Sequence, residues 1–246
     1  MRSVELVSDA SGFHGQVVVH GHWGRPVLVF PSEGGSAWDY AEHGMVDAVR
    51  WLVDGGQVKL YCVDSADAFT WSDRSVPLEE RARRHDLYER WLLDQVVTFI
   101  RDDCGGRTDL LATGCSLGAF HAANLALRHA DLVPQALCLS GSYDPSEWHA
   151  WGDRGEAAYF HNPTDYVNNL QGGHLDWLRS AVFLVLVVGQ GSWEVDPTRA
   201  LPSTRRFAGL LVEKGIPHEL DVWGHDVPHD WPSWQRQLAH HLPRFC

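Results

Sequence analysis

The fold is decided by the stretch Asp109-Leu110-Leu111-Ala112-Thr113-Gly114-Cys115-Ser116-Leu117-Gly118. Its first half is typical of an apolar strand, and the small-residue segment Ala119 to Leu127 that follows is typical of a helix. A serine in a Gly-x-Ser-x-Gly pattern between a strand and a helix lies on a sharp turn that exposes its hydroxyl. The two glycines let the strand and the helix approach without a Cβ clash. The N-terminus of the helix also brings partial positive charge to this place. The stretch therefore predicts a turn that presents Ser116 as a nucleophile.

The segments on either side of this turn alternate between strand and helix patterns. We expect further strands at Val4 to Ser8, Gly15 to Gly21, Pro26 to Pro31, Val58 to Asp64, Gln135 to Ser140, Ala181 to Gly189 and His218 to Trp223. We expect further helices at Tyr40 to Val53, Pro77 to Asp103, Arg199 to Lys214 and Pro232 to Leu242. Continuous apolar runs are typical of strands buried on both faces, whereas the first two strands read as antiparallel edge strands. The alternation predicts the α/β class, with a mostly parallel, doubly wound sheet and helices on both faces.

Length and charge narrow the class of protein further. The chain has 246 residues, enough for one large α/β domain or two small ones, and no Pro/Gly/Ser-rich linker divides it. We therefore expect a single domain over residues 1–246. The formal net charge is −12, from 20 basic and 32 acidic side chains. Because nucleic acids and anionic membranes both need a basic face, we expect neither as a partner.

The N-terminal residues, the apolar runs and the cysteines lead us to expect a cytoplasmic protein. The first residues lack the apolar region of a signal peptide, and the longest apolar run, Ala181 to Val188, is too short to span a membrane. The five cysteines show no Cys-x-x-Cys spacing, so they are interpreted as reduced thiols. The sequence leaves the oligomeric state open, a homo-oligomer included.

A serine hydroxyl needs a neighbouring base, and in folds with this turn the chain order is serine, acid, histidine. Two histidines, His225 and His229, follow the last expected strand. We expect His229 to be the base because it directly precedes the final helix, and His225 is the alternative.

The acid that orients the histidine is expected after the preceding long strand. Glu194 and Asp196 both lie in the loop that begins at Gly189. We favour Glu194 because it is closer to the end of the strand, with Asp196 second. Asp144, which follows the strand ending at Ser140, is a third candidate.

An oxyanion hole needs two main-chain N–H groups. One is expected from Leu117, directly after the nucleophile. The other is expected from Ser32 or Glu33, in the loop that follows Pro31 and contains Gly34 and Gly35. The glycines permit a tight backbone there, although a plain glycine turn would have the same sequence.

Several segments resemble one known family. They are the turn Gly114 to Ala119, the helix segment Tyr88 to Val96 and the ending His229 to Trp234, together with Phe120 to His129 and Lys214 to Gly224. Together they resemble the putative-esterase family of α/β hydrolases, which includes esterase D type enzymes, enterochelin esterases and mycobacterial mycolyltransferases, and within it a bacterial, cytoplasmic esterase-like branch.

The resemblance covers about Phe13 to Phe245 and implies an α/β-hydrolase fold. It implies Ser116 as nucleophile, His229 as base, an acid in the loop of Glu194 and an oxyanion N–H near Ser32 or Glu33. The acid loop, Gln190 to Pro197, is longer here than in many relatives, which leaves Asp196 open as the acid. Gln95 stands where relatives usually have glutamate, and we interpret it as a packing change.

Residues 142–179 lack clear alternation and are rich in aromatic residues, so we expect a small cap-like insertion above the serine. Trp148 and Trp151 in this segment, and Trp193 beside Glu194, are the expected pocket residues. Packing of an irregular segment against the body is the alternative interpretation. We expect no metal site, because the insertion shows no convincing metal-ligand spacing.

Three functions follow from these residues. The first is a serine hydrolase that cleaves a small-molecule carboxylic ester through an acyl-enzyme, without a cofactor. The second is an acyltransferase with the same triad, in which an alcohol or amine replaces water; a thioesterase or peptidase would also share this nucleophile chemistry. The third is a non-catalytic binding protein that keeps the fold, which would be expected to have lost a member of the triad.

Overall fold

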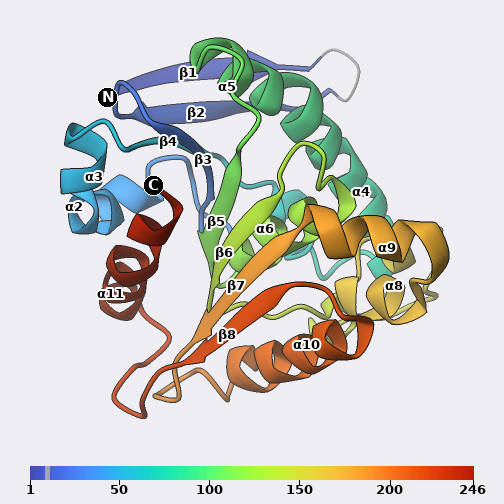
Figure 1. The fold of residues 1–246 in the computed structure, drawn as a ribbon. Coiled ribbons are helices and arrows are strands. Elements are labelled where there is room, and N and C mark those ends of the chain that lie inside the picture. The colour runs from blue at the N-terminus through green and yellow to red at the C-terminus, as the bar shows by residue number, and fades with distance from the viewer. Residues whose placement is uncertain (9–11) are drawn as a thin grey trace.

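The computed structural model describes residues 1–8 and 12–246, and its centre is one eight-stranded sheet with the order β1-β2-β4-β3-β5-β6-β7-β8 (Figure 1). The strands are β1 (Arg2–Val7), β2 (His14–His20), β3 (Arg25–Phe30), β4 (Val58–Val63), β5 (Leu111–Cys115), β6 (Gln135–Leu139), β7 (Phe183–Val188) and β8 (His218–Val222). β2 pairs antiparallel with β1 and β4, and all other pairs are parallel. The predicted α/β class with a mostly parallel sheet is confirmed.

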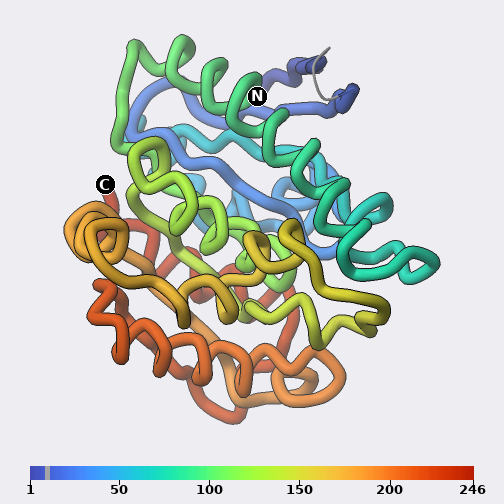
Figure 2. Tube along the Cα trace, turned by 90° about the vertical axis from the view of Figure 1, so that its right-hand side faces the viewer, coloured from blue at the N-terminus to red at the C-terminus, as the bar shows by residue number. Residues whose placement is uncertain are grey.

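Helices cover both faces of the sheet (Figures 1 and 2). The α-helices are α1 (Asp39–Glu42), α2 (Met45–Ala48), α3 (Arg50–Asp54), α4 (Leu78–Trp91), α5 (Thr98–Asp103), α6 (Leu117–Arg128), α7 (Glu156–Phe160), α8 (Pro163–Asn169), α9 (Gly172–Ala181), α10 (Ala200–Lys214) and α11 (Trp231–His241). Short 3-10 turns are η1 (Asp67–Phe69), η3 (Pro145–Glu147) and η4 (Leu242–Phe245), and η2 (Leu92–Val97) is a π-helical turn. One face carries α4, α6, α9 and α10, and the other carries α1 to α3 and α11.

Each central strand buries side chains on both faces, as its apolar run predicted. Leu28 of β3 is paired with Ala112 of β5, and both belong to the core cluster under α4 and α6. The next pair along, Val27 and Leu111, belongs to the cluster under α2 and α11. This division by alternate residues places two cores on one sheet.

Two predictions about elements are wrong. β2 is not an edge strand, because it lies between β1 and β4; only β1 forms that edge. The helix expected over residues 40–53 is three short helices, because Gly44 takes a left-handed conformation with φ 71° and Val49 is also non-helical. By contrast, the long helix expected to follow Pro77 runs to Asp103 as α4, η2 and α5 in succession.

The helices α7, α8 and α9 form the second part of the insertion expected over residues 142–179. They pack against the helices and core of the domain and do not form a cap over Ser116. α7 contacts α4, and α8 contacts α10. Leu175 and Leu178 of α9 are buried in the core cluster on the α4 and α6 face. The apolar side chains of α9 therefore serve the core, as in an ordinary crossover helix between two parallel strands.

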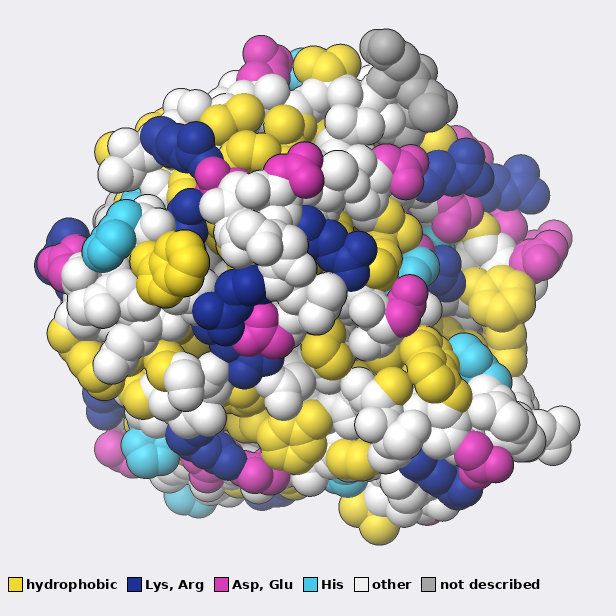
Figure 3. All heavy atoms as spheres, turned by 45° about the horizontal axis from the view of Figure 1, so that its top comes forward, with side chains coloured by type: hydrophobic (Ala, Val, Ile, Leu, Met, Phe, Trp, Pro, Cys, Tyr) yellow, Lys and Arg dark blue, Asp and Glu magenta, His cyan; other side chains and the backbone are white. Residues whose placement is uncertain are grey.

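The surface has mixed charge on the face shown in Figure 3, where acidic and basic side chains lie interspersed. Within residues 1–8 and 12–246, no helix is both long and apolar enough to cross a membrane.

The turn between β5 and α6 is built on close backbone contact. A Cβ at Gly114 would lie 2.4 Å from the backbone of Gly118, and a Cβ at Gly118 would lie 2.2 Å from the carbonyl oxygen of Pro31. Real side chains do not tolerate such distances, so both positions require glycine. The same contact presses the loop after β3 against the start of α6.

We expect Gly118→Ala to lower the free energy of unfolding by about 1–3 kcal/mol, because its methyl group would force the β3 loop away from the turn. Gly209→Ala is the matched control: Gly209 lies in α10 with nothing within 4 Å of a Cβ. The control is expected to raise the free energy of unfolding by up to about 1 kcal/mol. Urea unfolding measures both, and equal stability of the two variants would contradict this account of the turn.

Candidate active site

Ser116 occupies the strained position of the turn. Its φ is 57° and its ψ is −122°, a conformation that non-glycine residues rarely adopt. Its N–H donates to the carbonyl oxygen of Leu139 at 2.9 Å, which ties the turn to β6. The neighbouring Cys115 is fully buried, and burial raises the pKa of its thiol. Cys115 is therefore a neutral core residue, and Ser116 is the only one of the two that faces the cavity.

His229 reaches Ser116 from the loop between β8 and α11. Its Nε2 lies 3.0 Å from Oγ of Ser116. The backbone N–H of His229 donates to the carbonyl oxygen of Ser192 at 2.9 Å, and its ring packs edge-on against Trp234 with ring centroids 4.9 Å apart. The position of the imidazole is thus fixed by both its backbone and its ring.

Glu194 lies behind His229 and is completely buried. Its Oε2 is 3.1 Å from Nδ1 of His229. Its Oε1 accepts a hydrogen bond from Oγ of Ser140 at 2.6 Å and one from the N–H of Gly189 at 3.2 Å. A buried carboxylate needs such partners, because burying a charge without them is costly. The structure therefore brings Ser116, His229 and Glu194 into one continuous chain of hydrogen bonds.

The three alternative residues are used elsewhere or point to solvent. Asp196 is exposed on the same loop as Glu194, and His225 is exposed. Asp144 caps η3 by accepting from the N–H of Ser146, and it forms an ion pair with Arg206.

Ser140, which donates to Glu194, was not among the residues predicted from the sequence. Its position could have pointed to it, because Ser140 directly follows β6, which lies between β5 and β7 in the sheet. Side chains that follow neighbouring parallel strands converge at one edge of the sheet. Ser140 also has a positive φ of 53°, which no sequence pattern marks for a serine.

The loop after β3 provides the second wall of the site. Glu33 lines the same cavity as Ser116 and Leu117, whereas Ser32 does not. The N–H of Gly34 donates to the buried carboxylate of Asp67 at 3.1 Å, and the other oxygen of Asp67 lies 2.9 Å from Nε2 of His121. Of the two residues predicted to donate in this loop, Glu33 is the one that lines the cavity. Leu117, at the first position of α6, has an N–H without an intrahelical acceptor.

A cavity of about 170 Å³ opens above Ser116. Trp71, Trp148 and residues 197–200 are among the residues that line it. The prediction that Trp148 lines the pocket agrees with this lining, but Trp151 and Trp193 do not line it and are 51% and 66% exposed. Nothing in the sequence marked which tryptophans of the irregular loops turn inward.

The wall formed by the two tryptophans is held by Arg81. This side chain of α4 is fully buried and has no acidic partner within the described residues. Its guanidinium donates to the carbonyl oxygens of Val76, Trp71, Trp148 and His149 at 3.0 to 3.4 Å. Burial lowers the pKa of Arg81, but a guanidinium stays protonated in proteins. Arg81 thus joins the loop after β4 to the loop after β6.

Comparison with known proteins gives a family and a fold. Residues 39–245 match the family model described as putative esterase. A ferulic acid esterase structure aligns with a TM-score of 0.75 and 17% identity, over 99% of this chain and 96% of that one. The S-formylglutathione hydrolase FrmB of Staphylococcus aureus aligns with a TM-score of 0.70 and 13% identity, over 99% of this chain and 95% of that one. MPT51 of Mycobacterium tuberculosis aligns with a TM-score of 0.72 and 15% identity, over 98% of this chain and 96% of that one. No curated protein sequence matches the chain.

We expect Arg81→Leu to destabilise the protein by roughly 1–3 kcal/mol or more, because several buried carbonyl groups would lose their donor. Arg83→Leu on the same helix is the control, since Arg83 is 66% exposed and has only an ion pair with Glu79. The control is expected to change stability by less than about 0.5 kcal/mol. Urea unfolding measures the free energy of unfolding of both variants. A similar decrease in Arg81→Leu and Arg83→Leu would refute the role given to Arg81.

Proposed function

This chain belongs to the putative-esterase family, and from that premise we propose that it is a serine hydrolase that cleaves a small-molecule carboxylic ester through an acyl-enzyme intermediate. The observation that carries the proposal is the chain of hydrogen bonds from Ser116 through His229 to Glu194. The position of Ser116 on a strained turn at the floor of a cavity supports it.

In the first half of the reaction, Oγ of Ser116 attacks the ester carbonyl carbon and its proton passes to Nε2 of His229. Glu194 holds the imidazole in the correct orientation and stabilises the imidazolium that forms. The carbonyl oxygen becomes an oxyanion, which accepts hydrogen bonds from the N–H groups of Leu117 and Glu33. When the tetrahedral intermediate collapses, the C–O bond breaks and His229 gives its proton to the leaving alcohol.

In the second half, water replaces the alcohol. His229 takes a proton from this water, and the resulting hydroxide attacks the acyl carbon. Collapse of the second intermediate breaks the bond to Ser116, whose Oγ recovers the proton from His229. The products are a carboxylic acid and an alcohol, and the mechanism uses no cofactor.

The cavity supports a compact substrate and access of water. A cavity of about 150 Å³ is enough to hold benzene, so about 170 Å³ suits an acyl group no larger than a single ring or a short chain. Glu33 and Arg74 line this cavity and are exposed. Because the cavity is open to solvent at these residues, hydrolysis is favoured over transfer of the acyl group to another alcohol.

We expect a fluorophosphonate probe to label the folded protein and Ser116→Ala to remain unlabelled. The probe reacts only with a serine whose hydroxyl is activated by a neighbouring base. Mass spectrometry of the labelled peptide locates the adduct, and circular dichroism of the variant checks that it is folded. Absence of labelling in the wild-type protein would favour the non-catalytic alternative.

We expect Glu194→Gln to lower kcat/KM for a p-nitrophenyl ester by about 10³–10⁴-fold, as loss of the orienting acid does in other triads. Asp196→Asn is the matched control in the same loop, and its kcat/KM is expected to stay within a factor of about two because exposed substitutions rarely matter. A large loss in Asp196→Asn alone would assign the acid to Asp196 and refute the choice of Glu194.

A further inference from the structure

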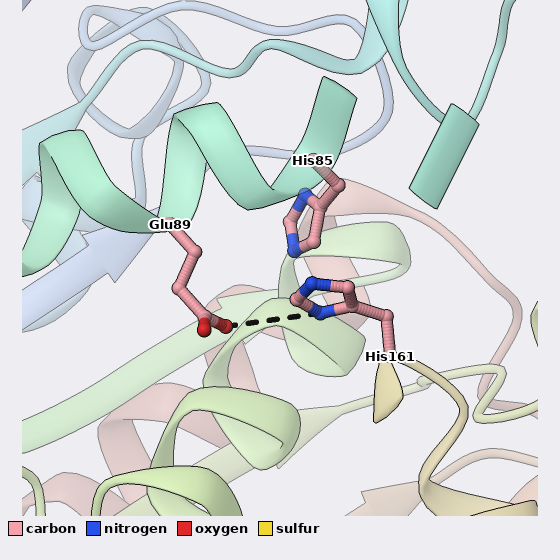
Figure 4. Close-up of side chains that lie close together, drawn as sticks. All are labelled: His85, Glu89 and His161. Carbon is pink, nitrogen blue, oxygen red and sulfur yellow. Dashed lines mark ion pairs between the residues drawn. The ribbon is translucent and has the colours of Figure 1, made fainter. Parts of the chain in front are cut away.

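Besides the Ser116–His229–Glu194 site, a second buried polar cluster packs against Trp71, on the side of this ring away from the cavity. It consists of His85 and Glu89 on α4 and His161 at the C-terminal end of α7 (Figure 4). All three residues are buried, and one possible ligand atom from each lies within 4.8 Å of the other two. The triad does not use any of them.

His85 has no hydrogen bond within the described residues. Its side chain is 2% exposed, and its Nδ1 is fully buried without a partner. Figure 4 shows its other ring nitrogen turned toward His161. This nitrogen, Nε2, makes no hydrogen bond within the described residues, so it can present a lone pair to a ligand in the cluster. Nε2 is therefore the atom that His85 offers to the cluster.

His161 is oriented by a carboxylate. Its Nε2 lies 2.6 Å from Oδ1 of Asp86, so Nε2 carries the proton and Nδ1 presents a lone pair toward the cluster. The Nδ1 atom lies 3.8 Å from Oε2 of Glu89 and 3.3 Å from the side-chain nitrogen of Asn124. A carboxylate behind a histidine is the usual outer partner of a metal-bound imidazole.

Glu89 completes the set because it lies four residues after His85, on the same face of α4. Its Oε1 accepts from Arg128 at 2.8 and 3.0 Å and contacts His129 at 3.1 Å. Its Oε2 accepts no hydrogen bond within the described residues and faces His161. One oxygen of a charged carboxylate is therefore left for another cation.

We propose that His85, Glu89 and His161 bind one zinc ion, with water as a fourth ligand. Two imidazoles and one carboxylate are an established ligand set for tetrahedral Zn²⁺. Three atoms no more than 4.8 Å apart lie within about 2.8 Å of a common centre, so each would move inward by roughly 0.7 Å to reach a zinc–nitrogen bond of about 2.1 Å.

The positive charge of Arg128 disfavours binding of a cation, and the negative charge of Asp86 offsets this repulsion. The guanidinium binds only Oε1 of Glu89, so the zinc would take the opposite oxygen. The carboxylates of Asp86 and Glu89 together bring two negative charges to a site in which Arg128 brings one positive charge. Zinc would also take the Nδ1 lone pair of His161, so the amide of Asn124 would turn to the bound water.

The ion would act on the cavity through Trp71. The ring of Trp71 packs against His85 with centroids 5.0 Å apart and against His161 at 6.3 Å, and the same ring lines the cavity. The zinc would link α4 to the segment after α7 and hold this wall in place. The zinc site is independent of the proposed ester hydrolysis and takes no part in its chemistry.

The test uses the full chain, expressed without a histidine tag and freed of metal with a chelator. We expect Co²⁺, a spectroscopic substitute for zinc, to give the strong visible absorption of a tetrahedral complex, saturating at one ion per chain and displaced by Zn²⁺. We also expect Zn²⁺ to raise the Tm. A wild-type protein without this absorption would overturn the proposal.

His85→Phe is the decisive variant, because phenylalanine keeps a packed ring and His85 has no hydrogen bond to lose. It is expected to fold without metal and to lose Zn²⁺ affinity by more than about 100-fold, since even outer partners of a metal site are worth 10–100-fold. His174→Phe, at an exposed histidine, is the control and should bind like wild type. Equal Co²⁺ spectra in His85→Phe and wild type would overturn the proposal, as would equal loss in His174→Phe.

Discussion

The rest of the structure depends on one steric constraint, the close contact between β5, the start of α6 and the end of β3. Gly114 and Gly118 let three backbones meet where any side chain would collide. The cost of this contact is the strained backbone of Ser116, which the surrounding hydrogen bonds and packing sustain. In return, the hydroxyl, the first N–H of a helix and the loop after Pro31 are all brought to one point. A site for acyl chemistry needs these three parts together.

Buried charge holds the site in two different ways. Glu194 is stabilised locally, by Ser140 and the N–H of Gly189, so that the hydrogen bond to His229 has a fixed direction. Arg81 is stabilised by carbonyl groups of two loops that are distant in sequence, and it thereby fixes the aromatic wall of the cavity. Both groups exchange hydration for several directed hydrogen bonds, which makes each arrangement specific as well as stable. The proposed zinc site would reinforce the same wall from behind.

Much of the fold and part of the site followed from local patterns. The continuous apolar runs gave the parallel strands because burial on both faces leaves no room for polar alternation. α10 ends at Lys214, as expected, because Gly215 takes a left-handed conformation with φ 64°. The order of serine, acid and histidine directed attention to Glu194 and His229, because parallel strands all end at one edge of the sheet. These inferences depend on local patterns and on the order in which the patterns follow one another along the chain.

The sequence by itself determined that the sheet is mostly parallel, that Ser116 lies on a turn, and which loops would provide an acid and a histidine. Only the tertiary structure decided that Glu194 is buried and Asp196 exposed, that Trp71 and not Trp193 lines the cavity, and that His161 meets His85. The physical reason is that periodicity reports which face of an element is apolar, but irregular loops have no period. The direction of a loop side chain is set by partners such as Ser140 or Arg81, which lie far away in the chain and close in space.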